Sequence, residues 1–210
     1  EIRGSFGRFA AIFAITALGV GFLAGLLSTA PDFYRTIDDY YDSDRFMDIN
    51  IKSTGGLTSE DLDAVKSESY VESAALYKVK DALIKNSDGN DSVARIFGCD
   101  EDSLNNKGEV NNTTLKEGRY PQNETECLAL VPNPFLSQPA LGTVYELNPE
   151  STDGISVKSL TVVGVAESPM YMSVEKETTD IGNGKISLVL FTGYQTFTTD
   201  YYTDIYLTLK

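Results

Sequence analysis

The stretch "RFAAIFAITALGVGFLAGLLSTAPDFYR", residues 8–35, decides what kind of chain this is. From Phe9 to Ala30 it holds 22 uncharged residues, which as a helix would be about 33 Å long and match the apolar core of a bilayer. "STA" resembles the cleavage site of an export signal, and a buried core helix is a third alternative. The uncharged run is longer than a signal requires, and Pro31 directly after the site would hinder cleavage. We therefore predict a retained transmembrane helix over 9–30.

The charges on either side of this helix predict its orientation. Arg3 and Arg8 precede it, whereas five aspartates and only two arginines lie within 31–45. Because positive charge is retained on the cytoplasmic side, we expect residues 1–8 to form a short cytoplasmic segment in a cell membrane. The acidic body of the chain is then extracytoplasmic.

Small residues form a stripe on one face of the predicted span. Ala17, Gly21 and Gly25 recur every fourth residue, and the last two form a GxxxG pair. Such a stripe lets a second helix approach closely, although glycine is also simply frequent in membrane helices. We expect a helix–helix contact here, which favours a protein with several spans.

The segment after the span predicts a second helical stretch. Phe33, Ile37 and Tyr40 lie at helical spacing, with Pro31 at a kink or at the start of a new first turn. We predict a stalk helix over 31–44. Its aspartates lack the glycine and the glutamate of a calcium-binding loop, so they indicate a solvated acidic face.

The body of the chain has two parts that differ in their sequence pattern. The first part predicts the order strand, helix, strand, strand. The strands are "FMDINIKST", "VESAALYKVKDALIKN" and "SVARIFGC", and the helix begins after the first strand at Thr58 and Asp61. The polar run 100–124 reads as a loop, and five short strands follow it as a mostly antiparallel module. The predicted fold class is α+β, with a porter-like part over 45–98 and 200–210 and a β-rich inserted part over 99–199.

Composition excludes several functions. The formal net charge of the 210 residues is −14, which disfavours binding to nucleic acid. The chain has no histidine, so a Ser-His-Asp triad is impossible, and "GNGK" (182–185) lacks the context of a phosphate-binding loop and reads as a hairpin turn. Cys99 and Cys127 are either one disulfide or two buried thiols. We expect no enzyme activity, no cofactor and no metal site.

The order of segments resembles the FtsX/MacB-like permeases of ABC transporters. The resemblance rests on "EIRGSFGRFAAIFAITALGVGF" at the start and on "DINIKSTGGLTSEDLDAVKS" with the following "YVESA". It extends to "LKEGRYPQNETECLAL", "LTVVGVAESPMYMS" and "YTDIYLTL", and so covers essentially the whole chain. No single motif is as specific as a nucleotide-binding signature.

This resemblance implies a mechanism and a set of partners. Such permeases have a MacB-like periplasmic core domain after the first span, pair with a separate cytoplasmic ATPase, and usually dimerise with a second permease copy. Movement of the spans then drives the outer domain, to export or mobilise lipids, lipoproteins, peptides or drugs. The family would continue beyond Lys210 with a helix, a strand and further spans, so we expect a fragment.

An alternative from another class stays open. A single-span surface protein could carry the same acidic outer domain as a module that binds an extracellular ligand or partner protein. A membrane-anchored hydrolase is a third hypothesis, but no carboxylate pair stands out as its site.

Overall fold

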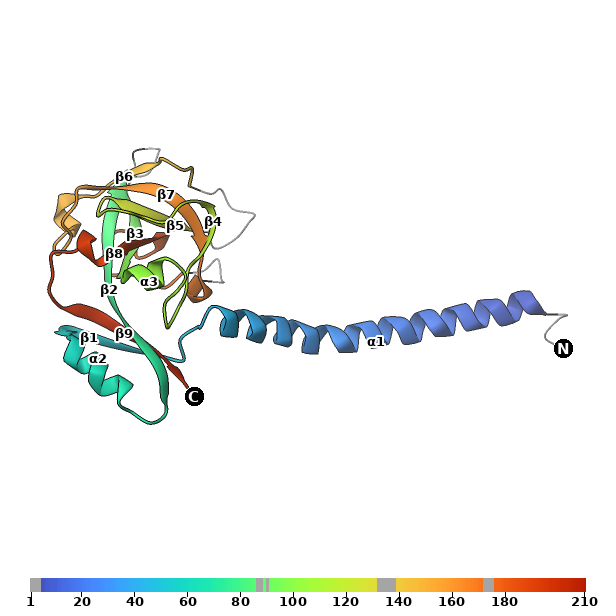
Figure 1. Cartoon of the computed structure of the whole chain (residues 1–210). Coiled ribbons are helices and arrows are strands. Elements are labelled where there is room, and N and C mark those ends of the chain that lie inside the picture. The colour runs from blue at the N-terminus through green and yellow to red at the C-terminus, as the bar shows by residue number, and fades with distance from the viewer. Residues whose placement is uncertain (1–4, 86–88, 90, 132–138, 172–175) are drawn as a thin grey trace. The chain divides into compact units, whose positions relative to one another are not determined.

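In the computed structural model, the described residues are 5–85, 89, 91–131, 139–171 and 176–210. The chain divides into two compact units, residues 1–42 and 43–210. The first consists of helix α1 (Phe6–Ser43), which runs without a break through Pro31 and is drawn as one ribbon in Figure 1. By its length and composition, α1 is able to cross a membrane. None of its residues from the apolar run is buried within the structure.

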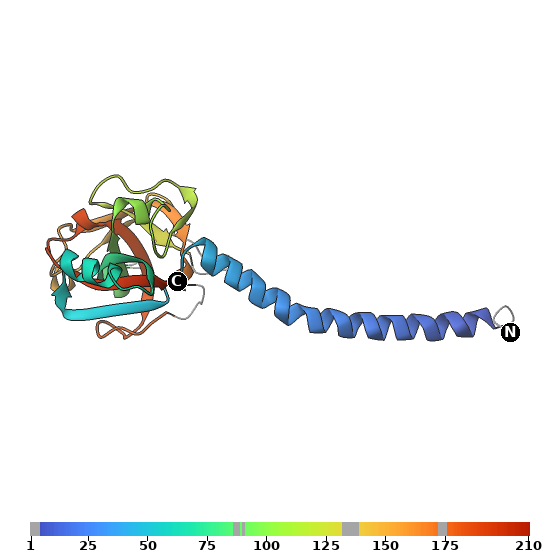
Figure 2. The same ribbon diagram turned by 60° about the horizontal axis from the view of Figure 1, so that its bottom comes forward.

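The described residues of the second unit form nine strands, three of which make a small sheet with a helix on one face. Strand β1 pairs with β9, and β9 pairs with β2, all antiparallel. Helix α2 covers this sheet, as Figure 2 shows from below, through Leu62 and Val65. The predicted cap of α2 is confirmed, because Thr58 and Asp61 form a complete capping box. The elements of this unit are β1 (Ile49–Leu57), α2 (Ser59–Lys66), β2 (Val71–Lys85), β3 (Asp91–Cys99), α3 (Glu101–Leu104), β4 (Thr114–Gly118), β5 (Glu126–Leu130), β6 (Val144–Glu146), β7 (Ser159–Glu167), β8 (Ile186–Gly193) and β9 (Tyr202–Leu209), with short 3₁₀ turns η2 (Pro149–Ser151), η3 (Pro169–Tyr171) and η4 (Tyr194–Thr196).

Strand β2 is long enough to pair with two other strands along its length. Its residues up to Tyr77 pair with β9, and its residues from Lys78 onward pair with β3. From β3 the sheet continues through β8, β5, β7 and β4, with β6 beside β7. The β3–β8 and β5–β7 pairings are parallel, a mixture that the short antiparallel-looking strands did not predict. The α+β class is nevertheless confirmed.

Alternating side chains give the larger sheet a core on each face. One cluster contains Phe97 and Cys99 of β3, and the other contains Ile96 of β3 and Cys127 of β5. The two cysteines therefore lie on opposite faces, and each is a free, buried thiol. Of the two alternatives for the cysteines, the disulfide is wrong and the pair of buried thiols is correct, because side chains on opposite faces of a sheet cannot reach each other.

The polar run 100–124 differs from the loop that its composition predicted. It contains α3 and β4, and its residues Val110–Thr113 are buried. The predicted division at residue 98 stays a prediction, since residues 43–210 pack as one unit and β3 pairs with β8 as well as with β2. The turn expected at "GNGK" is confirmed by positive φ values at Gly182 and Gly184.

Candidate functional site

The chain enters the second unit through Asp44–Asp48, which we call the root segment. In sequence it follows α1 and leads into β1. Asp48 fixes one side of the segment, since its N–H donates to the carbonyl of Leu207 (2.9 Å) and its carboxylate accepts from the N–H of Leu209 (2.7 Å). The root segment is therefore tied to β9 before β1 begins.

The other side of the root segment is held by Glu109–Thr113, which we call the anchoring loop. The N–H of Asn111 donates to the carbonyl of Arg45 (2.8 Å), and the N–H of Asn112 donates to the carbonyl of Asp44 (2.9 Å). In return, the side-chain oxygen of Asn111 accepts from the N–H of Met47 (2.9 Å). Two segments more than 60 residues apart in sequence are thus joined by three hydrogen bonds, two between backbone groups and one that a buried side-chain amide oxygen accepts.

Backbone strain is concentrated at this contact. Arg45 has φ 51° and Asn111 has φ 55°, both in the left-handed region that non-glycine residues rarely occupy. Asn111 is fully buried, and its side-chain nitrogen has no hydrogen-bond partner among the described residues. Such a group costs about 1–3 kcal/mol, so the surrounding contacts must compensate for it. Contacts with neighbouring residues must therefore hold Arg45 and Asn111 in these backbone conformations.

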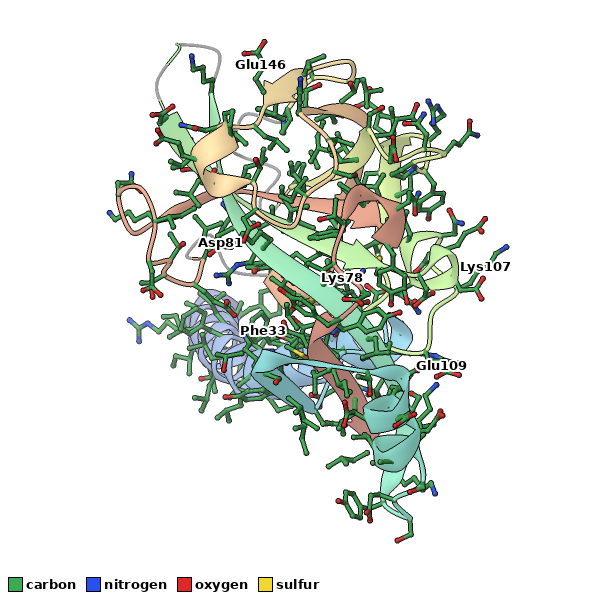
Figure 3. The ribbon with its side chains drawn as sticks, turned by 90° about the vertical axis from the view of Figure 1, so that its left-hand side faces the viewer. Phe33, Lys78, Asp81, Lys107, Glu109 and Glu146 are labelled. Atoms are coloured by element: carbon green, nitrogen blue, oxygen red, sulfur yellow. The ribbon has the colours of Figure 1, made fainter. Side chains whose placement is uncertain are left out.

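The anchoring loop also contacts both parts of the second unit. The ammonium of Lys66 on α2 lies 2.6 Å from the carboxylate of Glu109, which is labelled in Figure 3. The hydroxyl of Ser73 donates to the carbonyl of Glu109 (3.0 Å), and the buried hydroxyl of Tyr77 donates to the carbonyl of Val110 (3.2 Å). The anchoring loop is therefore bonded to the root segment, to α2 and to β2.

Lys78 lies at the point where β2 stops pairing with β9 and begins to pair with β3. Its side chain is nearly buried, its ammonium donates to the carbonyl of Thr199, and it lies 5.8 Å and 5.3 Å from the ring centres of Tyr194 and Tyr202. Burial lowers the pKa of this lysine. The hydroxyl of Tyr194 donates a hydrogen bond to the carbonyl of Leu76 (2.6 Å). Figure 3 shows Lys78 at the middle of β2, between the two groups of strands.

The residues that sequence reasoning selected lie elsewhere, on α1. At Gly21 and Gly25 an added Cβ would meet no atom within 4 Å in the described chain, so the proposed helix contact has no partner here. Phe33 is exposed, and Ile37 and Tyr40 are partly buried. The missed residues, Asn111 above all, carried only the weak signal that asparagine tolerates a left-handed backbone.

Comparison with known families gives the identity of this arrangement. Residues 9–210 match the model of the MacB-like periplasmic core domain. The chain belongs to this family. Membership in a family of periplasmic core domains places the second unit of this MacB-like chain outside the cytoplasm. A search of curated proteins found no match.

Solved structures of low sequence identity resemble the chain. The periplasmic region of MacB from Actinobacillus actinomycetemcomitans is 16% identical with a TM-score of 0.44, over 76% of this chain and 66% of that one. The extracellular domain of the ABC-type transporter YknZ from Gram-positive bacteria is 13% identical with a TM-score of 0.44, over 79% and 81%. A domain of a putative permease from Porphyromonas gingivalis is 15% identical with a TM-score of 0.40, over 76% and 63%. The chain thus spans just under two thirds of the MacB region that it matches.

The MacB-like domain holds no grouped metal ligands in its described part. No cluster of three or more histidine, cysteine, aspartate or glutamate side chains suited to a metal occurs among those residues. Its buried polar contacts instead fasten segments of the chain to one another. The root segment and the anchoring loop thus form one bonded junction within the second unit.

Proposed function

We propose that this chain is part of the membrane subunit of an ABC transporter, in which α1 drives the movement of the outer domain. A cytoplasmic ATPase partner supplies the energy, and a second permease copy packs against the span through Ala17, Gly21 and Gly25. The N-terminus lies in the cytoplasm, as the arginines before the span favour. The cargo is a lipid, a lipoprotein, a peptide or a drug, the classes that the family resemblance implies.

The observation that carries this proposal is the direct connection between α1 and a root segment bonded on both sides. At about 1.5 Å per residue, the 38 residues of α1 extend for about 57 Å. Pro31 removes one backbone hydrogen bond but does not end the helix. A continuous helix followed by a bonded segment transmits a push, a pull or a rotation, whereas a flexible linker would absorb it.

A flexible insertion tests the mechanism. In the complete permease with its ATPase, Gly-Ser is inserted after Pro31, and a spin-label pair on the outer domain reports its ATP-dependent movement. We expect ATP hydrolysis to persist while the movement and the transport are lost. The matched control places the same Gly-Ser in the exposed turn between Gly182 and Gly184, where movement should be kept.

One outcome would contradict the proposal. If the insertion after Pro31 leaves both the movement and the transport at the level of the control insertion, α1 does not transmit force. Co-purification then decides the partner: a chain that binds no ATPase subunit would instead be a single-span binding protein.

A further inference from the structure

A polar cleft lies on the β-rich part of the second unit, formed by three separate segments. Its volume is about 560 Å³, within the range of sites for small ligands. Glu101, Leu104 and Asn105 come from α3 and its end, residues 119–122 come from the connection between β4 and β5, and Gly193 and Gln195 come from the end of β8 and from η4. No residue of the root segment or the anchoring loop lines it.

The walls of the cleft are fixed by hydrogen bonds outside it. The guanidinium of Arg119 donates twice to the carboxylate of Glu126 (2.7 and 2.5 Å), and that carboxylate also accepts from the N–H of Gln122 (2.9 Å). These contacts lower the pKa of Glu126 to about 2, so the carboxylate stays ionised. The hydroxyl of Thr196 in η4 donates to the carbonyl of Glu124 (2.9 Å) and joins two of the walls.

The polar groups that face the cleft are unused by the protein itself. Within the described chain, no hydrogen bond or ion pair joins the side chains of Glu101, Asn105, Gln122 or Gln195, or the hydroxyl of Tyr120, to another residue. The side chain of Gln195 lies close to the backbone of Gly193, because a Cβ added at Gly193 would be 2.3 Å from the amide oxygen of Gln195. Glycine at 193 therefore leaves the space that this amide occupies.

The chemistry of this lining disfavours an anion and a lipid. An anion would find no free cation, since Arg119 is held by Glu126 and Glu101 adds a negative charge. A lipid would find few apolar side chains, mainly Leu104 and Pro121. Three side-chain amides, a carboxylate and a phenol among the lining residues instead offer both donors and acceptors. Sugar hydroxyls, which both donate and accept, are the groups that such a set satisfies.

We propose that this cleft binds a neutral carbohydrate, a short oligosaccharide outside the cell membrane. The proposal goes beyond the coupling function and does not depend on it, because the cleft shares no residue with the root segment or the anchoring loop. It assigns to the β-rich part the task of contacting a glycan.

Ligand-detected NMR on the whole chain in lipid nanodiscs tests this inference. The probes are N,N′-diacetylchitobiose and cellobiose at millimolar concentration, with acetyl-trialanine amide as a neutral peptide probe. We expect saturation transfer to at least one disaccharide. Gln122→Ala and Glu101→Gln should each weaken its binding about 2- to 12-fold, the equivalent of one net hydrogen bond.

A control variant and a folding check make the result decisive. Glu146→Gln changes an exposed glutamate on β6 that does not line the cleft, and should leave binding unchanged. Thermal midpoints equal to that of the unmodified chain show that the variants are folded, which is expected because Gln122 and Glu101 are exposed. Saccharide binding that Gln122→Ala and Glu101→Gln leave intact would overturn the assignment. So would the absence of saccharide binding, with or without binding of the peptide.

Discussion

Removing one buried hydroxyl, by Tyr77→Phe, tests whether the anchoring loop holds the root segment. Tyr77 is 1% exposed, its hydroxyl donates to the carbonyl of Val110 (3.2 Å), and its ring lies 4.8 Å from that of Tyr206. Phenylalanine keeps the ring contact and removes only the donor, so the buried carbonyl loses its partner. The net hydrogen bond is worth about 0.5–1.5 kcal/mol, and an unpaired buried carbonyl adds to the loss, which gives about 1–2 kcal/mol.

The assay is thermal unfolding of the whole chain in nanodiscs, followed by near-ultraviolet circular dichroism. For a domain of this size, 1 kcal/mol corresponds to about 2–4 °C, so the midpoint should fall by about 2–8 °C. Hydrogen exchange should also become faster at the amides of Met47, Asn111 and Asn112, because their bonds depend on the position of the loop.

Tyr145→Phe is the matched control. The hydroxyl of Tyr145 is half-buried and makes no hydrogen bond with the described residues, so its removal should change stability by less than about 0.5 kcal/mol. Equal midpoints for the two variants, or unchanged exchange at the root segment in Tyr77→Phe, would refute the reasoning.

Three further predictions concern strain, crowding and pH. At Arg45 (φ 51°) the Ala variant should be about 1 kcal/mol less stable than the Gly variant in thermal unfolding, and equal stabilities would argue against strain. Gly118→Ala should cost about 1–3 kcal/mol more than Gly142→Ala, since both have φ near 80° but only at Gly118 would a Cβ meet backbone, the carbonyl of Val163 at 2.3 Å. Because Arg119 lowers the pKa of Glu126 to about 2, the ion pair's contribution to stability is complete above about pH 5 and is lost as the pH falls toward 2. Glu126→Gln should therefore remove this part of the fall in the unfolding midpoint between about pH 5 and about pH 2. An unchanged dependence of the midpoint on pH in that range would contradict the prediction.

Local signals in the sequence located most of the elements. The uncharged run predicted a long apolar helix, the pair Thr58 and Asp61 predicted the start of α2, and alternation predicted β1. These features depend on residues within one or two turns of each other, which is why they could be predicted.

The candidate site could not be predicted in the same way. Asn111 and Asn112 stand in a polar run that has the composition of an exposed loop, yet both are buried because the chain before β1 covers them. The cleft draws its residues from three segments that are distant in sequence, so no local pattern marks it.

The sequence by itself determined a membrane-compatible helix, an acidic α+β body and the absence of a histidine-based site, because these follow from composition and short-range periodicity. Only the tertiary structure decided that β2 serves two groups of strands, that Cys99 and Cys127 face opposite sides of a sheet, and that residues 109–113 hold the root segment. Strand pairing and buried hydrogen bonds depend on partners far along the chain, and these partners meet only when the whole core has formed.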